Sequence, residues 1–77
     1  MSIKVRYFAS LKETVGRSED ELESIAPLSV RDIWRQLNPD LAMPETLLAA
    51  INMDYVSLDA NVDEGDELAF FPPVTGG

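Results

Sequence analysis

The chemistry available to this chain is concentrated in its last eight residues. They read Phe70-Phe71-Pro72-Pro73-Val74-Thr75-Gly76-Gly77. A strand-like aromatic pair runs into two prolines, and the chain then narrows to two glycines and a bare carboxylate. Cysteine and histidine are both absent from the sequence, which excludes disulfides and the usual zinc ligand sets. We therefore expect the residues before this tail to hold and present the carboxylate of Gly77.

Length and charge narrow the class of protein. The 77 residues suit one domain, and an apolar content of 45% is enough for one packed core. Fourteen acidic and six basic residues give a net charge of −8, which disfavours nucleic acid and anionic membrane surfaces as partners. The chain shows no apolar signal region at its start and no run near the roughly 18 apolar residues of a membrane span. We expect a cytoplasmic protein.

The first element that must support the tail is a strand over residues 3–9, where apolar and polar residues alternate. Its core-facing positions are Ile3, Val5 and Tyr7. Its other face carries Lys4, Arg6 and Phe8, and the two charged residues are read mainly as a solvated strand face. Phe8 is thus an aromatic residue on a polar side.

Two helices are predicted. Ser10 and Glu13 have the spacing of a capping box, and Gly16 ends that short helix. Ser29 and Asp32 mark the start of the main helix, which ends where Asn38 precedes a proline. Its apolar stripe comprises Val30, Ile33, Trp34 and Leu37, and both Trp34 and Tyr7 are expected in the core.

Four further strands are expected, over residues 20–25, 46–52, 55–57 and 67–71. The nearly continuous apolar run 46–52 predicts a central strand buried on both faces. In the last strand, Phe70 alternates with Phe71, so one ring should point inward and the other outward. Two prolines then end the sheet, because proline cannot donate a ladder hydrogen bond.

This order of elements favours an α+β fold with a mixed sheet of four to five strands on one main helix. If the first and last strands lie side by side in the middle, they are parallel and the tail leaves from an anchored point. That arrangement is the β-grasp. We assign residues 1–71 to the domain and 72–77 to an extended, flexible tail.

The chain resembles the small sulfur-carrier subunits of molybdopterin synthase, a ubiquitin-like β-grasp family. The resemblance runs nearly end to end and rests on the opening from Ile3 to Ala9, the middle Leu47-Leu48-Ala49-Ala50-Ile51-Asn52, and the close from Gly65 to Gly77. The final eight residues are its most specific part.

The resemblance implies a carrier without catalytic side chains of its own. A partner adenylating enzyme of the E1 type would use ATP to convert the Gly77 carboxylate into an acyl-adenylate, and a sulfur donor protein would replace AMP to give a thiocarboxylate. The large subunit of the synthase would then pass this sulfur to cyclic pyranopterin monophosphate. No stably bound cofactor or metal is implied.

The tail residues fit that use. If extended, the six residues from Pro72 to Gly77 span roughly 20 Å, at ~3.3–3.6 Å each, enough to thread a channel in a partner. Pro72 and Pro73 keep the near end extended and reduce the entropy lost on insertion. Val74 and Thr75 continue the thread. Gly76 and Gly77 have no Cβ, so the backbone can lie close to a nucleotide and an attacking group.

A docking patch is the second predicted site. Phe8 and Phe71, with Leu58 or Val74 nearby, are expected to form an apolar interface with partners, and the alternative is that both rings are buried under loops. Two other functions stay open: a sulfur carrier of another pathway, such as thiamine thiazole synthesis, or a modifier conjugated to protein lysines; and a free-standing interaction domain with an incidental tail.

Overall fold

The computed structural model describes residues 2–23 and 27–73. The elements in chain order are β1 (Ser2–Tyr7), α1 (Ser10–Val15), β2 (Glu19–Glu23), β3 (Leu28–Ser29), α2 (Val30–Leu37), β4 (Leu48–Ile51), β5 (Asp54–Val56), β6 (Asn61–Val62) and β7 (Glu67–Phe71). Within these described parts of the chain, neither helix has the length and apolar character needed to cross a membrane.

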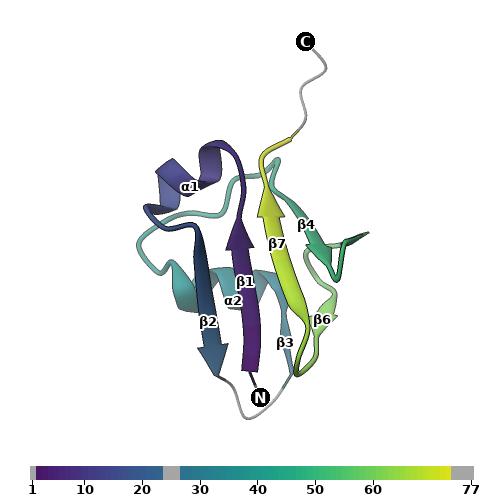
Figure 1. Cartoon of the computed structure of the whole chain (residues 1–77). Coiled ribbons are helices and arrows are strands. Elements are labelled where there is room, and N and C mark those ends of the chain that lie inside the picture. Colours follow the sequence, from purple (N-terminus) through teal and green to yellow (C-terminus); the bar gives the residue numbers. More distant parts are fainter. Residues whose placement is uncertain (1, 24–26, 74–77) are drawn as a thin grey trace.

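Five of the strands form one mixed sheet in the order β2-β1-β7-β4-β5. β1 and β7 are parallel, with Lys4 opposite Glu67 and Tyr7 opposite Phe70, and the remaining pairs are antiparallel. α2 packs across one face of this sheet, and Figure 1 shows the other face toward the viewer. The predicted ubiquitin-like β-grasp fold, with its first and last strands side by side, is confirmed.

The two predicted helix starts have different outcomes. At α2, the Ser29 hydroxyl accepts a hydrogen bond from the backbone N–H of Asp32 at 3.1 Å, so this cap is confirmed. At α1, the capping-box prediction is wrong, because Ala9 occupies the N-cap position and makes no side-chain cap. Ser10 is already helical, and its carbonyl accepts a hydrogen bond from Thr14 Oγ1 at 3.3 Å. β1 ends at Tyr7, and the backbone turns at Ala9 with φ 53°.

Strand boundaries are shorter or shifted relative to the sequence prediction. The expected strand 46–52 is reduced to Leu48–Ile51 because Leu47 already bonds back to the Pro44 carbonyl in a turn. β2 begins at Glu19, and residues 24 and 25 of its predicted range lie outside the described residues. The short pair β3–β6 was not predicted, since two-residue strands give no periodic pattern.

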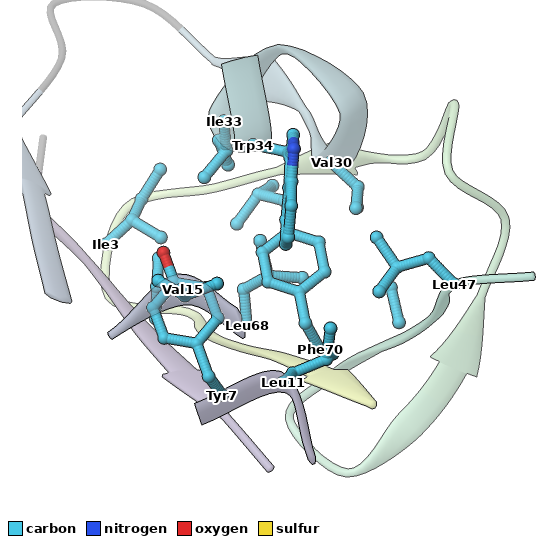
Figure 2. Close-up of a cluster of buried hydrophobic side chains, with 13 residues drawn as sticks. Ile3, Tyr7, Leu11, Val15, Val30, Ile33, Trp34, Leu47, Leu68 and Phe70 are labelled. Carbon is cyan, nitrogen blue, oxygen red and sulfur yellow. The ribbon is translucent and has the colours of Figure 1, made fainter. Parts of the chain in front are cut away.

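The core lies between the sheet and α2, and aromatic rings form its centre (Figure 2). The Phe70 ring lies 5.9 Å from Tyr7 and 5.2 Å from Trp34, centroid to centroid, in stacked and edge-to-face arrangements. Such pairs add to the stabilisation from burial alone. All three residues are almost fully buried, as predicted. Phe70 therefore anchors β7 immediately before the tail.

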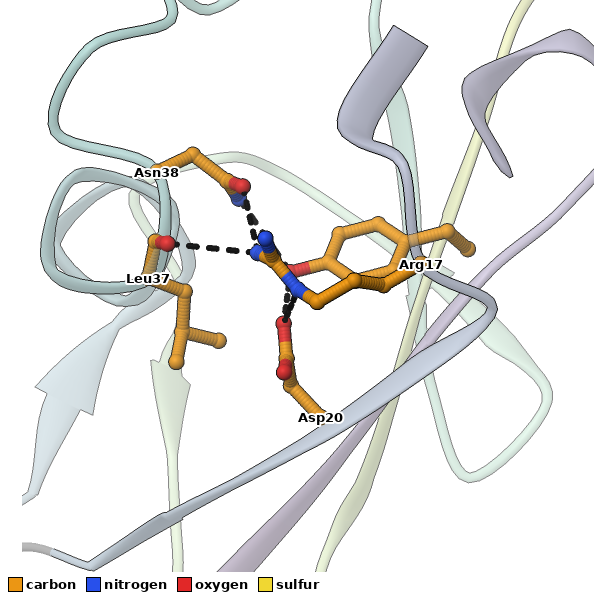
Figure 3. Close-up of polar contacts among 5 residues, drawn as sticks. Arg17, Asp20, Leu37 and Asn38 are labelled. Carbon is orange, nitrogen blue, oxygen red and sulfur yellow. Dashed lines mark hydrogen bonds and ion pairs between the residues drawn. The ribbon is translucent and has the colours of Figure 1, made fainter. Parts of the chain in front are cut away.

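A polar network closes the core at the end of α2 (Figure 3). The Arg17 guanidinium donates to Asp20 Oδ2 at 2.8 Å, to Asn38 Oδ1 at 2.7 Å and to the Leu37 carbonyl at 3.2 Å. The Tyr7 hydroxyl donates to Asp20 Oδ2 at 2.9 Å and accepts from Asn38 Nδ2 at 3.1 Å. Asn38 is buried, so these bonds satisfy a side chain that would otherwise cost free energy. The network ties α2 to β1 and β2.

Candidate docking face and carrier tail

The face of the sheet opposite α2 is built by the period-two alternation of its strands. Positions that avoid the core lie side by side across four strands. Arg6 of β1 is opposite Ala69 of β7, and Ala69 is opposite Ala50 of β4. Ala50 is in turn opposite Tyr55 of β5. We call this surface the outer face.

Aromatic rings gather at one end of the outer face. The Phe8 and Phe71 rings lie 5.3 Å apart, and Tyr55 meets Phe71 edge-to-face at 5.8 Å. Phe8 is 39% exposed and Phe71 is half-buried. The structure thus places both predicted rings outside the core and next to each other, while their role in docking stays a prediction.

Among the described residues, the large hydrophobic side chains that are exposed lie in this region. The large hydrophobic residues that are exposed there are Phe8, Leu48, Met53 and Tyr55. Leu48 lies opposite Phe71 in the β4–β7 register, and Met53 follows β4 at the turn into β5. These four residues and Phe71 form what we call the outer apolar patch. A contiguous apolar patch of this kind is typical of a protein interaction site.

Leu58 does not belong to the outer apolar patch, contrary to the sequence prediction. It is half-buried and packs against the core cluster. Its carbonyl accepts a hydrogen bond from the backbone N–H of Arg31 at 3.0 Å, which holds this segment against the first turn of α2. The sequence pattern did not show that the chain after β5 turns toward the helix.

The root of the tail is fixed on both sides of β7, and on the β4 side Phe71 is paired with Leu48. The Phe8 backbone N–H donates to the Phe70 carbonyl at 3.1 Å, which extends the β1–β7 contact to the end of the strand. Pro72 is half-buried and Pro73 is exposed, and the strand ends at Phe71 as the prolines predicted. Val74, Thr75, Gly76 and Gly77 lie outside the described residues.

The other half of the outer face is charged. Lys4 and Arg6 stand between the glutamates of β2 and Glu67 of β7, with Lys4 opposite Glu21 and Arg6 opposite Glu19. Arg6 Nε lies 3.7 Å from Glu67 Oε1. Exposed pairs of this kind contribute little to stability. Among the described residues, no group of three or more acidic side chains is arranged to hold a metal ion.

The sequence pattern does not predict that Leu48, Met53 and Tyr55 belong to the outer apolar patch. Tyr55 belongs to an edge strand of three residues, too short for alternation to assign its face. Leu48 was assigned to a strand buried on both faces, yet it is 36% exposed. Met53 was assigned only to a turn.

A five-stranded mixed sheet on one main helix, with an apolar patch beside the end of its last strand, defines a small ubiquitin-like β-grasp protein. More narrowly, the chain belongs to the ThiS family, whose model matches residues 5–77.

Known proteins resemble this chain both in sequence and in fold. The chain is 40% identical to a molybdopterin synthase sulfur carrier subunit of Escherichia coli, with 97% of this chain and 99% of that protein covered. The crystal structure of SAMP1 from Haloferax volcanii, 26% identical, covers the whole of both chains with a TM-score of 0.80. A Pyrococcus furiosus protein described as a putative molybdopterin converting factor, subunit 1, is 29% identical, covers 96% of this chain and 99% of its own, and has a TM-score of 0.77.

Proposed function

We propose that this protein is a sulfur carrier in molybdenum cofactor synthesis. The E. coli relative is a molybdopterin synthase sulfur carrier subunit and matches over almost the full length of both chains. The structural observation that carries the proposal is the anchored tail root: Phe70 is fully buried, Phe71 is part of the outer apolar patch, and Pro72 follows directly.

The reaction takes place at the carboxylate of Gly77 and needs no side chain of this chain. A carboxylate oxygen attacks the α-phosphorus of ATP on the adenylating partner, and pyrophosphate leaves. The terminal sulfur of a persulfide on the donor protein then attacks the acyl carbon, and AMP leaves. A thiol attacks the donor sulfur of the resulting acyl disulfide, so the thiocarboxylate leaves and the donor and the thiol end as a disulfide. In the large synthase subunit, the sulfur of the thiocarboxylate bonds to cyclic pyranopterin monophosphate. Water then cleaves the acyl–sulfur bond and regenerates the carboxylate of Gly77.

The fold contributes rigidity and a docking surface to this sequence of steps. A strand held by Phe70 and by the β1 contact gives the tail a fixed origin, so a partner that binds the outer apolar patch meets the tail at a defined place. Fixing the origin reduces the ordering entropy that the complex would otherwise cost. Phe8 and Phe71 are the docking residues nearest that origin.

The terminal role of Gly77 is tested by appending one residue to it. The extended variant should fold like the unmodified protein, because β7 ends at Phe71, and it should form no molybdopterin in a reconstituted mixture. The mixture contains adenylating enzyme, ATP, sulfur donor, large subunit and cyclic pyranopterin monophosphate. Gly76→Val is the companion variant, in which a β-branched side chain obstructs a narrow partner channel. Normal product formation by the extended variant would show that the terminus is not the reacting group.

A protein modifier is the second candidate, favoured by the fold match to SAMP1, a small archaeal modifier protein. Affinity purification from the native host separates the candidates. Recovery of a large synthase subunit supports the carrier of molybdenum cofactor synthesis. Covalent conjugates through Gly77 to lysines of other proteins would favour the modifier, and recovery of a thiazole synthase would favour the thiamine pathway.

A further inference from the structure

The outer apolar patch is not flat, because a hollow of about 350 Å³ lies within it. Two alanines, Ala50 and Ala69, are paired across β4 and β7 and form its floor. Phe71, Tyr55 and Met53 border the hollow above them. This volume is at the small end of the ~300–1,000 Å³ range of ligand pockets. It suits one bulky side chain of a docked protein.

Met53 borders this hollow and has a backbone conformation that is unfavourable for methionine. Asn52 and Met53 form the two-residue loop between β4 and β5, with φ 50° and 75°. A loop with both residues at positive φ suits asparagine first and glycine second, because a side chain at the second position is strained. The Met53 side chain is also 94% exposed, so the described part of the chain does not compensate this strain through packing.

The loop that carries Met53 is held firmly. Asn52 Nδ2 donates to Asp66 Oδ1 at 2.9 Å, and Asn52 Oδ1 accepts from the Glu67 backbone N–H at 3.0 Å. The Asn52 backbone N–H donates to the Glu67 carbonyl at 2.9 Å. Three hydrogen bonds therefore fix the loop to the start of β7 and place Met53 at the edge of the hollow before any partner arrives.

We propose that the hollow is a socket for one bulky apolar side chain of the large synthase subunit, and that Met53 forms a wall of this socket in contact with that subunit. This inference rests on the proposed function. The occupant follows from continuity, since Phe71 is both a wall of the hollow and the last strand residue before Pro72. We therefore expect a protein that receives the tail to cover the hollow as well.

The charge around the hollow indicates which partner surface would fit around the side chain that enters the socket. Among the described residues that border the hollow, Arg6 is the one cation, and its Nε lies 3.7 Å from Glu67 Oε1. The whole chain carries a net charge of −8. A complementary partner surface has an apolar side chain at its centre and cationic side chains around it.

Two variants test the socket through binding of the complete chain to the purified large subunit. Ala69→Leu fills the floor of the hollow and should raise Kd about tenfold or more, which is the range for a blocked interface centre. Met53→Gly should also raise Kd, severalfold, while it raises the melting temperature by a few degrees because strain at positive φ is relieved. A gain in stability together with a loss of binding is not expected of a purely structural residue.

Matched controls separate these effects from general damage. Met53→Leu keeps an apolar side chain at the same strained position, so its Kd should rise less than that of Met53→Gly and its melting temperature should not increase. Ala42→Leu adds the same atoms to a hollow on the helix side, beside Trp34 and Met43, and should leave Kd unchanged.

The outcomes are distinct. If the unmodified chain binds and both Ala69→Leu and Met53→Gly bind equally well, the socket does not exist although the proposed function stands. If these variants weaken binding to the adenylating enzyme alone, the occupant is wrong and the proposal fails. If the unmodified chain does not bind the large subunit, the proposed function fails and the socket with it. If Ala69→Leu does not fold, the Kd of Met53→Gly for the large subunit alone tests the socket.

Discussion

Tyr7 links the core to the polar network, and the titration of its hydroxyl should make the stability of the protein depend on pH. The ring stacks on Phe70 inside the core, while the hydroxyl contacts Asp20 and Asn38. Burial raises the pKa of the Tyr7 hydroxyl above its usual value of about 10. The hydrogen bond to Asp20 raises the pKa of Arg17, so this cation stays charged across the range in which Tyr7 titrates.

We predict that Tyr7 makes the protein less stable in strong base. In the unfolded chain the hydroxyl loses its proton near pH 10, whereas the folded chain keeps it to higher pH. The folded state then binds more protons, so the free energy of unfolding falls as the pH rises above about 10, and this group contributes no pH dependence well below that.

Tyr7→Phe isolates this effect in urea unfolding at a series of pH values. At neutral pH the variant should be less stable by about 1 kcal/mol, because Asn38 loses a hydrogen-bond acceptor. The difference between the two proteins should shrink above about pH 10. A difference that stays constant across that range would show that the Tyr7 hydroxyl titrates alike in both states.

Among the elements, α2 begins with a side-chain N-cap and α1 begins without one. The Ser29 hydroxyl bonds to the Asp32 backbone N–H, whereas Ser10 is already inside α1. α2 matters more for the fold, since its buried residues Val30, Ile33 and Trp34 cover the inner face of the sheet.

Ser29→Ala and Ser10→Ala form a matched pair that tests these assignments. Ser29→Ala should destabilise the protein by about 1 kcal/mol, which corresponds to a fall in melting temperature of about 4–8 °C for a domain of this size. Ser10→Ala should change it little, because alanine is a good helix former and no cap is lost. Equal losses in thermal unfolding would contradict the corrected assignment of the α1 start.

Several elements could be predicted because each rests on a local rule. The alternation in β1, the stripe of α2 and the two prolines after β7 all act within a few residues, and the structure agrees with them. The α1 start was mispredicted because the capping-box spacing is satisfied locally, while the β1–β7 contact at Phe8 displaces the turn to Ala9.

The candidate site was only partly predictable for a related reason. The period-two pattern of their strands predicts that Phe8 and Phe71 point away from the core. Met53, Ala50 and Ala69 become neighbours through the β4–β7 and β4–β5 pairings, which no short segment encodes. Leu58 was misassigned because its burial depends on a turn toward α2.

At the scale of the whole molecule, one side of the sheet is used for folding and the other is available for recognition. α2 and the aromatic core occupy the inner face, while the outer apolar patch lies on the side shown toward the viewer in Figure 1. β7 belongs to both, because Phe70 is in the core and Phe71 is in the patch. The strand therefore connects the stability of the domain to the position of its tail.

We propose that Gly77 carries the sulfur, and mass spectrometry of the intact chain detects this modification. The protein is incubated with its adenylating enzyme, ATP and a sulfur donor, with a parallel sample that lacks ATP. We predict a product heavier by one oxygen-to-sulfur exchange, located by fragmentation at Gly77 and absent without ATP. A chain of unchanged mass in the complete mixture, with an adenylating enzyme shown to be active, would show that Gly77 does not carry sulfur.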